Sequence, residues 1–144
     1  MSLIKQSSSR PTIRIATACL IDKSDRILVV RKRGTTIFML PGGKIESTET
    51  AIEALKRELR EELGLTVESK ELEPLGHFGS RAANEPNHWV EADVFTGRVF
   101  GSVAALAEIE ATVWIALDAE PDITLAPLLK EQVLPALRLR FGAV

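Results

Sequence analysis

Residues 43–65 read GKIESTETAIEALKRELREELGL, and this stretch predicts a helix with marked ends and a marked apolar face. Ser47 or Thr48 can cap its start by accepting a hydrogen bond from a free backbone N–H, and Gly64 can end it in the left-handed conformation. At about 100° per residue, one apolar stripe runs along the helix and consists of Ile52, Leu55, Leu59 and Leu63. The helix is therefore expected to pack on a core along this stripe.

Acidic residues border the stripe instead of lying opposite it: Glu58, Glu61 and Glu62. Each like-charge pair at helical spacing costs roughly 0.2–0.5 kcal/mol, and only Glu61 has a basic residue, Arg57, three or four places away. A solvated acidic face is the common explanation of such a cluster, but it needs counter-charges. A hard divalent cation with oxygen ligands explains the cluster better. Ala51 and Ala54, one turn earlier, are expected to leave room there for a compact ligand.

Before the helix, Pro41, Gly42 and Gly43 predict a turn at which the backbone comes close to another group, because glycine has no side chain in the way. Residues 38–40, FML, predict a short buried strand that leads into this turn. Neither the G-x-x-x-x-G-K-[ST] spacing of a Walker loop nor a G-x-G-x-x-G sequence occurs in the chain. Those nucleotide-binding motifs are excluded.

The same stretch carries a spaced pattern made up of Gly43, Glu49, Arg57, Glu58, Leu59, Glu61, Glu62, Gly64 and Leu65. These residues match every defined position of G-x5-E-x7-R-E-U-x-E-E-x-G-U, where U is a bulky aliphatic residue, so the chain resembles the Nudix hydrolases, and its MutT-like members in particular. The resemblance implies a pyrophosphohydrolase that uses Mg²⁺ or Mn²⁺ to cleave nucleoside diphosphates linked to another group. It also implies an α/β fold of the α+β kind, an α/β/α sandwich with a mixed central sheet and a catalytic loop-helix-loop.

The resemblance further implies roles for single residues. The metal ligands would be Glu58, Glu61 and Glu62, with a backbone carbonyl from Gly42 or Gly43. Glu49 and Arg57 would form a salt bridge that orients the site. Glu58 is the first candidate for the general base. Glu108 or Glu110 is the second, because relatives often carry an additional acid in this loop, and Glu108 is also a candidate metal ligand.

On either side of the box, apolar and β-branched runs predict strands. Residues 12–21 and 26–33 predict a hairpin, and residues 72–79 and 89–100 predict a second pair joined by the polar loop 80–88. Residues 108–117 predict another strand, and the run that starts at Pro127 predicts a last helix that Pro135 must kink or split. With no repeat or linker, residues 11–144 are expected to form one domain and residues 1–10 to be mobile.

Candidate substrate contacts lie outside the box. Arg31-Lys32-Arg33 precedes the glycines, and Arg31 and Arg33 are the candidates for binding a diphosphate, although the sequence does not decide among the three. His88 lies in the polar loop and is a further candidate. Trp114, or Trp89, offers an aromatic face that holds any base by roughly 1–3 kcal/mol, and core packing is an equal alternative for both. His77 is expected to be structural.

The composition, 45% hydrophobic and 26% charged over 144 residues, is typical of one globular domain. A formal net charge of −2 argues against binding to nucleic-acid polymers or anionic membranes, which leaves a small-molecule nucleotide as the expected partner. Cys19, the single cysteine, lies in an apolar run and is expected to be buried and inert. The chain has neither a membrane-length apolar stretch nor a signal peptide, so a cytoplasmic protein is expected. The sequence leaves open whether it forms a homodimer.

Among substrates, a nucleoside triphosphate is preferred over ADP-ribose and dinucleoside polyphosphates, because the chain is short and lacks the additional N-terminal domain of many ADP-ribose hydrolases. Two other functions stay open. One is a module on the same fold that senses a nucleotide without hydrolysing it, and the other is a structural domain with a solvated acidic helix. Metal-dependent release of phosphate separates the enzyme from both.

Overall fold

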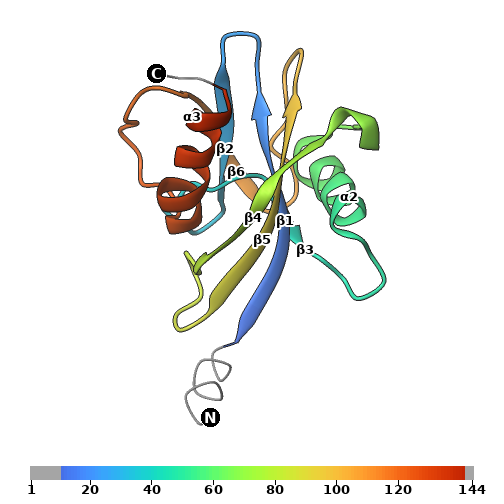
Figure 1. Ribbon diagram of the computed structural model, residues 1–144, viewed down its shortest axis with the longest axis vertical. Coiled ribbons are helices and arrows are strands. Elements are labelled where there is room, and N and C mark those ends of the chain that lie inside the picture. Colours follow the sequence, from blue (N-terminus) through green and yellow to red (C-terminus); the bar gives the residue numbers. More distant parts are fainter. Residues whose placement is uncertain (1–10, 142–144) are drawn as a thin grey trace.

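A computed structural model describes residues 11–141 of the chain, so the predicted mobility of residues 1–10 lies outside the described residues. A six-stranded mixed sheet forms the middle layer, with helix α2 (Ala51–Leu63) on one face and helix α3 (Leu134–Arg140) on the other (Figure 1). This arrangement is the predicted α/β/α sandwich. No helix within residues 11–141 combines the length and the apolar character needed to cross a membrane.

The strands are β1 (Thr12–Ile21), β2 (Arg26–Lys32), β3 (Gly42–Lys44), β4 (Glu73–Arg81), β5 (Trp89–Arg98) and β6 (Ile109–Ala116), and a short 3₁₀ turn, η1 (Ser69–Glu71), precedes β4. Their order is β4-β5-β1-β2-β6, and β3 pairs with β1. β1 lies parallel to β5 and antiparallel to β2 and β3. Both predicted strand pairs, β1 with β2 and β4 with β5, are confirmed.

Alternation along the strands creates a core on each face of the sheet. In β1, Ala16, Ala18 and Leu20 pack with the buried leucines of α2, whereas Cys19 and Ile21 pack with the C-terminal helical segment. The predicted burial of Cys19 is confirmed, and burial raises the pKa of its thiol to about 12. Each face of the sheet needs its own helix because side chains of one strand alternate between the two faces.

Gly42 and Gly43 do not form the predicted turn, because they lie within β3 and pair with Thr17 and Ala16 of β1. Gly42 has a φ of 139°, and a Cβ atom at this position would collide with the carbonyl oxygen of Ala16. Gly42 therefore permits a close approach, as expected, but the group that it approaches is the backbone of a neighbouring strand. The predicted strand at residues 38–40 is reduced to isolated bridges, Phe38 with Leu125 and Met39 with Val30.

Helix α2 begins later than predicted, because its N-cap is Thr50 and not Ser47 or Thr48. The Thr50 hydroxyl accepts from the Glu53 N–H at 3.2 Å, and the Glu53 carboxylate accepts from the Thr50 N–H at 2.9 Å, which is a capping box. At the other end, Gly64 adopts the left-handed conformation with φ 68°, as predicted. Ala54 is fully buried in the core, so the room expected above it is filled.

The last helix is split, as predicted from Pro135. A π-helical segment, η2 (Leu128–Val133), leads into α3, and the Leu134 N–H donates to the carbonyl of Leu129, five residues earlier. Proline has no N–H to donate and its ring crowds the preceding turn, so the widened turn accommodates it.

Candidate active site

The glycine strand brings the backbone against two of the box glutamates. A Cβ atom on Gly43 would lie 2.5 Å from Cδ of Glu58, so the carboxylate occupies the space of the missing side chain. The Gly42 N–H donates to Oε1 of Glu62 at 3.2 Å. Strand β3 and helix α2 therefore form a site in which two carboxylates face a backbone segment that carries no side chains.

Glu62 is buried, with 3% of its surface exposed. Its pKa is raised to about 8, first because burial disfavours the charged form and then because the Glu58 carboxylate lies nearby. The Gly42 N–H and the positive charge of Lys32 oppose this rise. Lys32 and the Gly42 N–H therefore do not supply enough positive charge to keep Glu62 ionised at neutral pH.

Arg57 connects the other box residues. Its guanidinium binds Glu49 through Nε at 2.6 Å and Nη2 at 2.8 Å, which holds the pKa of Glu49 at about 2. It also donates to Glu58 at 2.9 Å and to the carbonyl of Lys44 at 3.1 Å. The expectation that only Glu61 has a counter-charge is therefore wrong, because the long Arg57 side chain folds back onto its sequence neighbour.

Glu61 lies apart from this pair of carboxylates. Its side chain is 56% exposed, and its Oε1 lies 3.6 Å from Nη1 of Arg57. Within residues 11–141, no three acidic, histidine or cysteine side chains already converge like the ligands of a bound metal. The geometry brings together Glu58, Glu62 and the β3 backbone, while Glu61 points toward solvent at their border.

Lys32 lies near Glu62 and contacts Glu108. The Lys32 ammonium is 3.6 Å from Glu108 and close enough to Glu62 to lower its pKa. The predicted basic cluster contained Lys32, but Arg31 and Arg33 were preferred. Because Leu28 and Val30 face α2, strand alternation places Lys32 on the side of α2 as well, whereas contacts of Arg31 and Arg33 with a substrate stay predictions.

The other predicted contact residues have partners of their own. Arg31 donates to the carbonyl of Thr35 at 2.8 Å and lies 3.5 Å from Glu110, and Arg33 donates to the carbonyl of Ala107 at 3.3 Å. Nδ1 of His88 lies 2.9 Å from the carbonyl oxygen of Pro86.

Both tryptophans also have defined surroundings. The guanidinium of Arg26 lies over the ring of Trp114, with Cζ 6.0 Å from the ring centre. Trp114 and the turn between β1 and β2 line the same hollow. Trp89 donates to Glu91 at 2.6 Å. Glu91 in turn lies 2.6 Å from Nε2 of His77, whose Nδ1 is 2.8 Å from Asp93. His77 is thus held between two carboxylates on the sheet surface, which raises its pKa.

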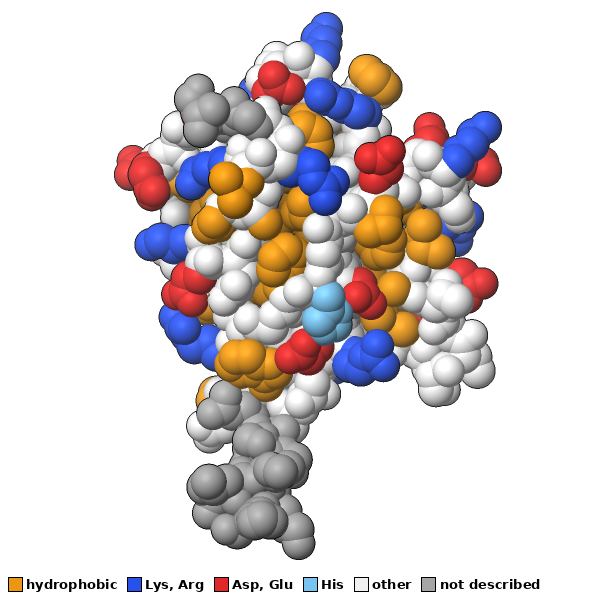
Figure 2. All heavy atoms as spheres, in the orientation of Figure 1, with side chains coloured by type: hydrophobic (Ala, Val, Ile, Leu, Met, Phe, Trp, Pro, Cys, Tyr) orange, Lys and Arg blue, Asp and Glu red, His pale blue; other side chains and the backbone are white. Residues whose placement is uncertain are grey.

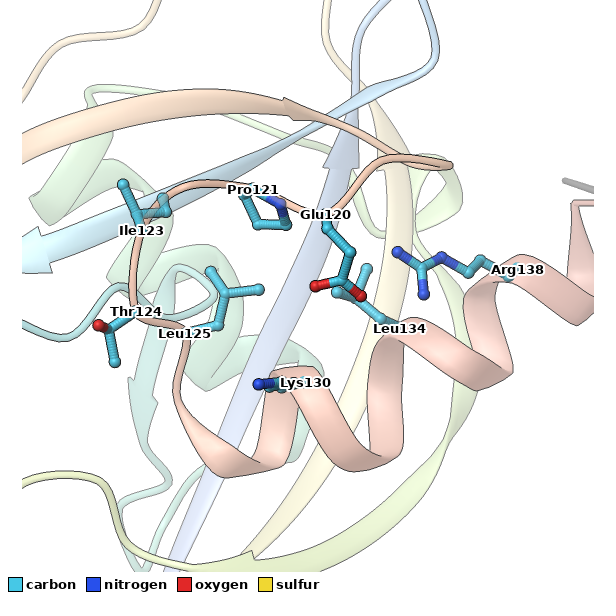
Figure 3. A pocket seen from close by; sticks show the side chains of 8 residues that line it. All are labelled: Glu120, Pro121, Ile123, Thr124, Leu125, Lys130, Leu134 and Arg138. Atoms are coloured by element: carbon cyan, nitrogen blue, oxygen red, sulfur yellow. The ribbon is translucent and has the colours of Figure 1, made fainter.

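Another cavity among the described residues has a different lining. A cavity of about 220 Å³ between residues 120–125 and the C-terminal helical segment contains Glu120, Lys130 and Arg138, and no box residue lines it (Figure 3). On the face seen in Figure 2, acidic and basic side chains are interspersed and form no continuous basic field.

Comparison with known proteins gives matches of family, sequence and fold. The NUDIX domain family model matches residues 11–137. An ADP-ribose pyrophosphatase of Methanocaldococcus jannaschii is 36% identical over 90 residues, which are 60% of this chain and 52% of the relative. An RNA pyrophosphohydrolase of Halorhodospira halophila is 38% identical over 63 residues, which are 44% of this chain and 33% of the relative. The chain thus spans about half or less of the curated relatives it matches.

A solved structure agrees over more of the chain. The solution structure of the E. coli ORF135 protein is 26% identical, covers 94% of this chain and 95% of its own, and superimposes with a TM-score of 0.71. The family match extends well beyond the glutamate helix and includes the sheet and most of the C-terminal helical segment. The chain belongs to the NUDIX family.

Proposed function

We propose that this protein is a Nudix hydrolase, a metal-dependent pyrophosphohydrolase that cleaves the diphosphate linkage of a nucleoside diphosphate joined to another group. The observation that carries the proposal is the juxtaposition of the Glu58 and Glu62 carboxylates with the side-chain-free backbone of Gly42 and Gly43. A purely structural role does not explain why Glu62 is buried beside a second carboxylate, since burial of unpaired charge is costly.

The donor set suits a hard divalent cation. Mg²⁺ takes oxygen ligands and usually binds one or two carboxylates while it keeps positions for water and substrate phosphates. Glu58, Glu62 and a carbonyl of Gly42 or Gly43 would hold Mg²⁺ or Mn²⁺, and Glu61 would join them after its exposed side chain rotates. A bound cation would neutralise charge on the phosphate oxygens and lower the pKa of a bound water.

The remaining residues would position the substrate and move the proton. In the proposed reaction, water attacks one phosphorus atom, the bridging P–O bond breaks, and a carboxylate oxygen of Glu58 accepts the proton of the water. Arg57, anchored by Glu49, holds the Glu58 carboxylate over Gly43. Lys32 is available to bind a phosphate, and Glu108, which it contacts, is the second candidate for the base.

The preferred substrate is a nucleoside triphosphate, cleaved to the monophosphate and pyrophosphate. ADP-ribose is the second candidate, supported by the name of the Methanocaldococcus relative. A sensing module without turnover is less well supported, because every acid of the box is present. Contacts of Arg31, Arg33, His88 and Trp114 with substrate, and a cytoplasmic location, stay predictions from the sequence.

The test is a panel of nucleoside triphosphates, ADP-ribose and dinucleoside polyphosphates, incubated with the pure protein and Mg²⁺ and scored for each phosphate product. Glu62→Gln serves as the matched control, because it keeps the size of the side chain but removes its charge. We expect turnover that chelator abolishes and that Glu62→Gln lowers by about 10²-fold. Turnover that is unchanged in excess chelator would contradict the proposal.

A further inference from the structure

The hollow beside Trp114 has a volume of about 360 Å³. Its walls are the turn between β1 and β2, residues 99–101 after β5, and Trp114 of β6. Arg26, in this hollow, begins β2, and Lys32, near Glu62, ends it. β2 has seven residues and spans roughly 20 Å at about 3.3 Å per residue. The hollow is therefore separate from the candidate active site.

A guanidinium group is held in place over an aromatic ring in this hollow. Nε and Nη2 of Arg26 contact Oδ2 of Asp22, each at 2.8 Å, and Cζ lies 6.0 Å from the ring centre of Trp114. A cation at this distance from an indole face is attracted to it. Nη1 takes part in neither contact with Asp22. The guanidinium is thus oriented before a ligand arrives, and its Nη1 can donate to an anion.

The carboxylate of Asp22 is already engaged by its own turn. Oδ1 accepts from the backbone N–H groups of Ser24 and Arg26, both at 2.9 Å, and Oδ2 accepts from the Arg26 guanidinium. Because its lone pairs face these donors, Asp22 opposes an anion less than a free carboxylate would. Lys23, the next residue of the turn, is exposed and adds a positive charge to the wall. The hollow can therefore accept a negative charge.

Phe100 forms another part of the wall and is 81% exposed. Single exposed apolar residues are common, but this ring stands beside a hollow that also contains Trp114. Gly101 follows it with a φ of 109°, which other residues rarely adopt, and a Cβ atom there would meet nothing within 4 Å. The glycine thus serves the path of the backbone beside Phe100 and not a close approach. A planar ligand in the hollow can contact both aromatic rings and cover their apolar surface.

The lining combines two aromatic rings with two positive side chains, which fits a planar aromatic group that carries a negative charge. Bases stack on aromatic rings whatever their identity, and arginine and lysine side chains bind phosphate groups. The volume is near the lower end of the range of small-molecule pockets, roughly 300–1,000 Å³, so the ligand must be compact. A nucleoside monophosphate meets these requirements.

We propose that this hollow is a second binding site, separate from the acids, for a compact planar anion of the nucleoside monophosphate class. The base would contact Phe100 and Trp114, and the phosphate would bind Lys23 and Nη1 of Arg26. A nucleoside monophosphate is also the product expected of the proposed reaction, so the protein itself would generate such a ligand. The inference concerns binding alone and does not depend on the proposed hydrolysis.

The experiment follows the fluorescence of Trp114 in a Trp89→Phe background, in which Trp114 is the single tryptophan. AMP, adenosine and ribose 5-phosphate are titrated in excess chelator, which separates the contribution of the base from that of the phosphate. Lys23→Gln and Phe100→Ser each remove one proposed contact at an exposed position. Leu139→Ser is the matched control, because Leu139 is 82% exposed, belongs to α3 and does not line the hollow.

We expect AMP to quench the fluorescence saturably, with a Kd below about 1 mM. Adenosine and ribose 5-phosphate should bind at least about tenfold more weakly, because each lacks one half of the ligand. Lys23→Gln and Phe100→Ser should each weaken AMP binding by about tenfold, while Leu139→Ser stays within about twofold. The absence of saturable quenching by AMP, or equal affinities of Phe100→Ser and Leu139→Ser, would overturn the inference.

A second measurement avoids the Trp89→Phe background. In equilibrium dialysis against AMP, Phe100→Ser should bind less AMP than Leu139→Ser and wild type, and equal binding by all three would also overturn the inference. The substrate panel decides the proposed function separately. Quenching without turnover would refute the hydrolase alone, and turnover without quenching would refute the second site alone.

Discussion

Gly43 and Glu58 are packed so closely that no methyl group fits between them, whereas Gly42, one residue earlier, is packed against the backbone of Ala16. The two neighbouring glycines thus serve different purposes. Gly42 permits the pairing of β3 with β1, and Gly43 makes room for a carboxylate.

The first prediction contrasts these glycines. Gly43→Ala should lower kcat by about tenfold or more, because the added methyl group displaces the carboxylate end of Glu58. The Tm of this variant should change little. Gly42→Ala should destabilise the fold by roughly 1–3 kcal/mol, because its φ of 139° and the Ala16 carbonyl leave no place for a side chain. Thermal unfolding and steady-state kinetics of both variants test this. The pair would be misassigned if Gly43→Ala unfolded the protein and Gly42→Ala did not.

The second prediction concerns the metal. Glu58→Gln and Glu62→Gln should each lower kcat by about 10²-fold or more. In chelator at neutral pH or above, Glu62→Gln should melt higher than wild type, because it removes the cost of burying beside Glu58 a carboxyl group that is ionised in the unfolded chain. Millimolar Mg²⁺ or Mn²⁺ should stabilise wild type by mass action and should not stabilise the variant as much. Leu59→Ala, in the buried stripe of the same helix, is the contrasting control and should cost about 2–5 kcal/mol.

The third prediction follows from the pKa of Glu62, which burial raises to about 8 in the metal-free protein. Between about 4.5, the ordinary value, and 8, the folded state binds more protons than the unfolded state. Stability should therefore fall as pH rises through this window. His77 acts in the same direction above about pH 6.5, because its pKa is also raised. The difference in stability between wild type and Glu62→Gln, measured by urea unfolding from pH 5 to 9, isolates Glu62. A difference that does not vary with pH would contradict the assignment.

The fourth prediction tests Arg57 as a positioning residue. Arg57→Lys keeps the charge but loses the two-pronged contact with Glu49, so kcat should fall by roughly 10- to 10²-fold. Glu49→Gln should have a similar effect. The double variant should be little worse than either single one, because both changes release the same guanidinium. Fully additive losses in a double-mutant cycle would show that the two residues act independently.

Local patterns predicted the local structure well. The limits of β1, the end of α2 at Gly64 and the split at Pro135 all depend on residues close in sequence, and the structure agrees. The start of α2 was wrong because Ser47, Thr48 and Thr50 can all act as caps. The choice depends on Glu49, which accepts from the N–H of Glu46 and binds Arg57, so residues 46–49 stay outside the helix.

Features that depend on distant pairing were not predictable from the sequence. The pairing of Gly42 with Thr17 decides that the glycines form a strand. No local pattern gives that register. Lys32 differs, because the alternation of its strand, which the prediction of Arg31 and Arg33 did not use, places it on the side of α2.

The parallel pairing of β1 with β5 also has a consequence for how the chain folds. It joins Thr12 to Trp89 and closes a loop that contains β2, β3, α2 and β4. Closing so long a loop costs chain entropy before its contacts compensate, so topologies of this kind fold in roughly milliseconds to seconds. A ribosome must therefore release β5 before β1 can complete the sheet. Until then Glu58 and Glu62 contact β3, whose own partner β1 still lacks its pairing with β5.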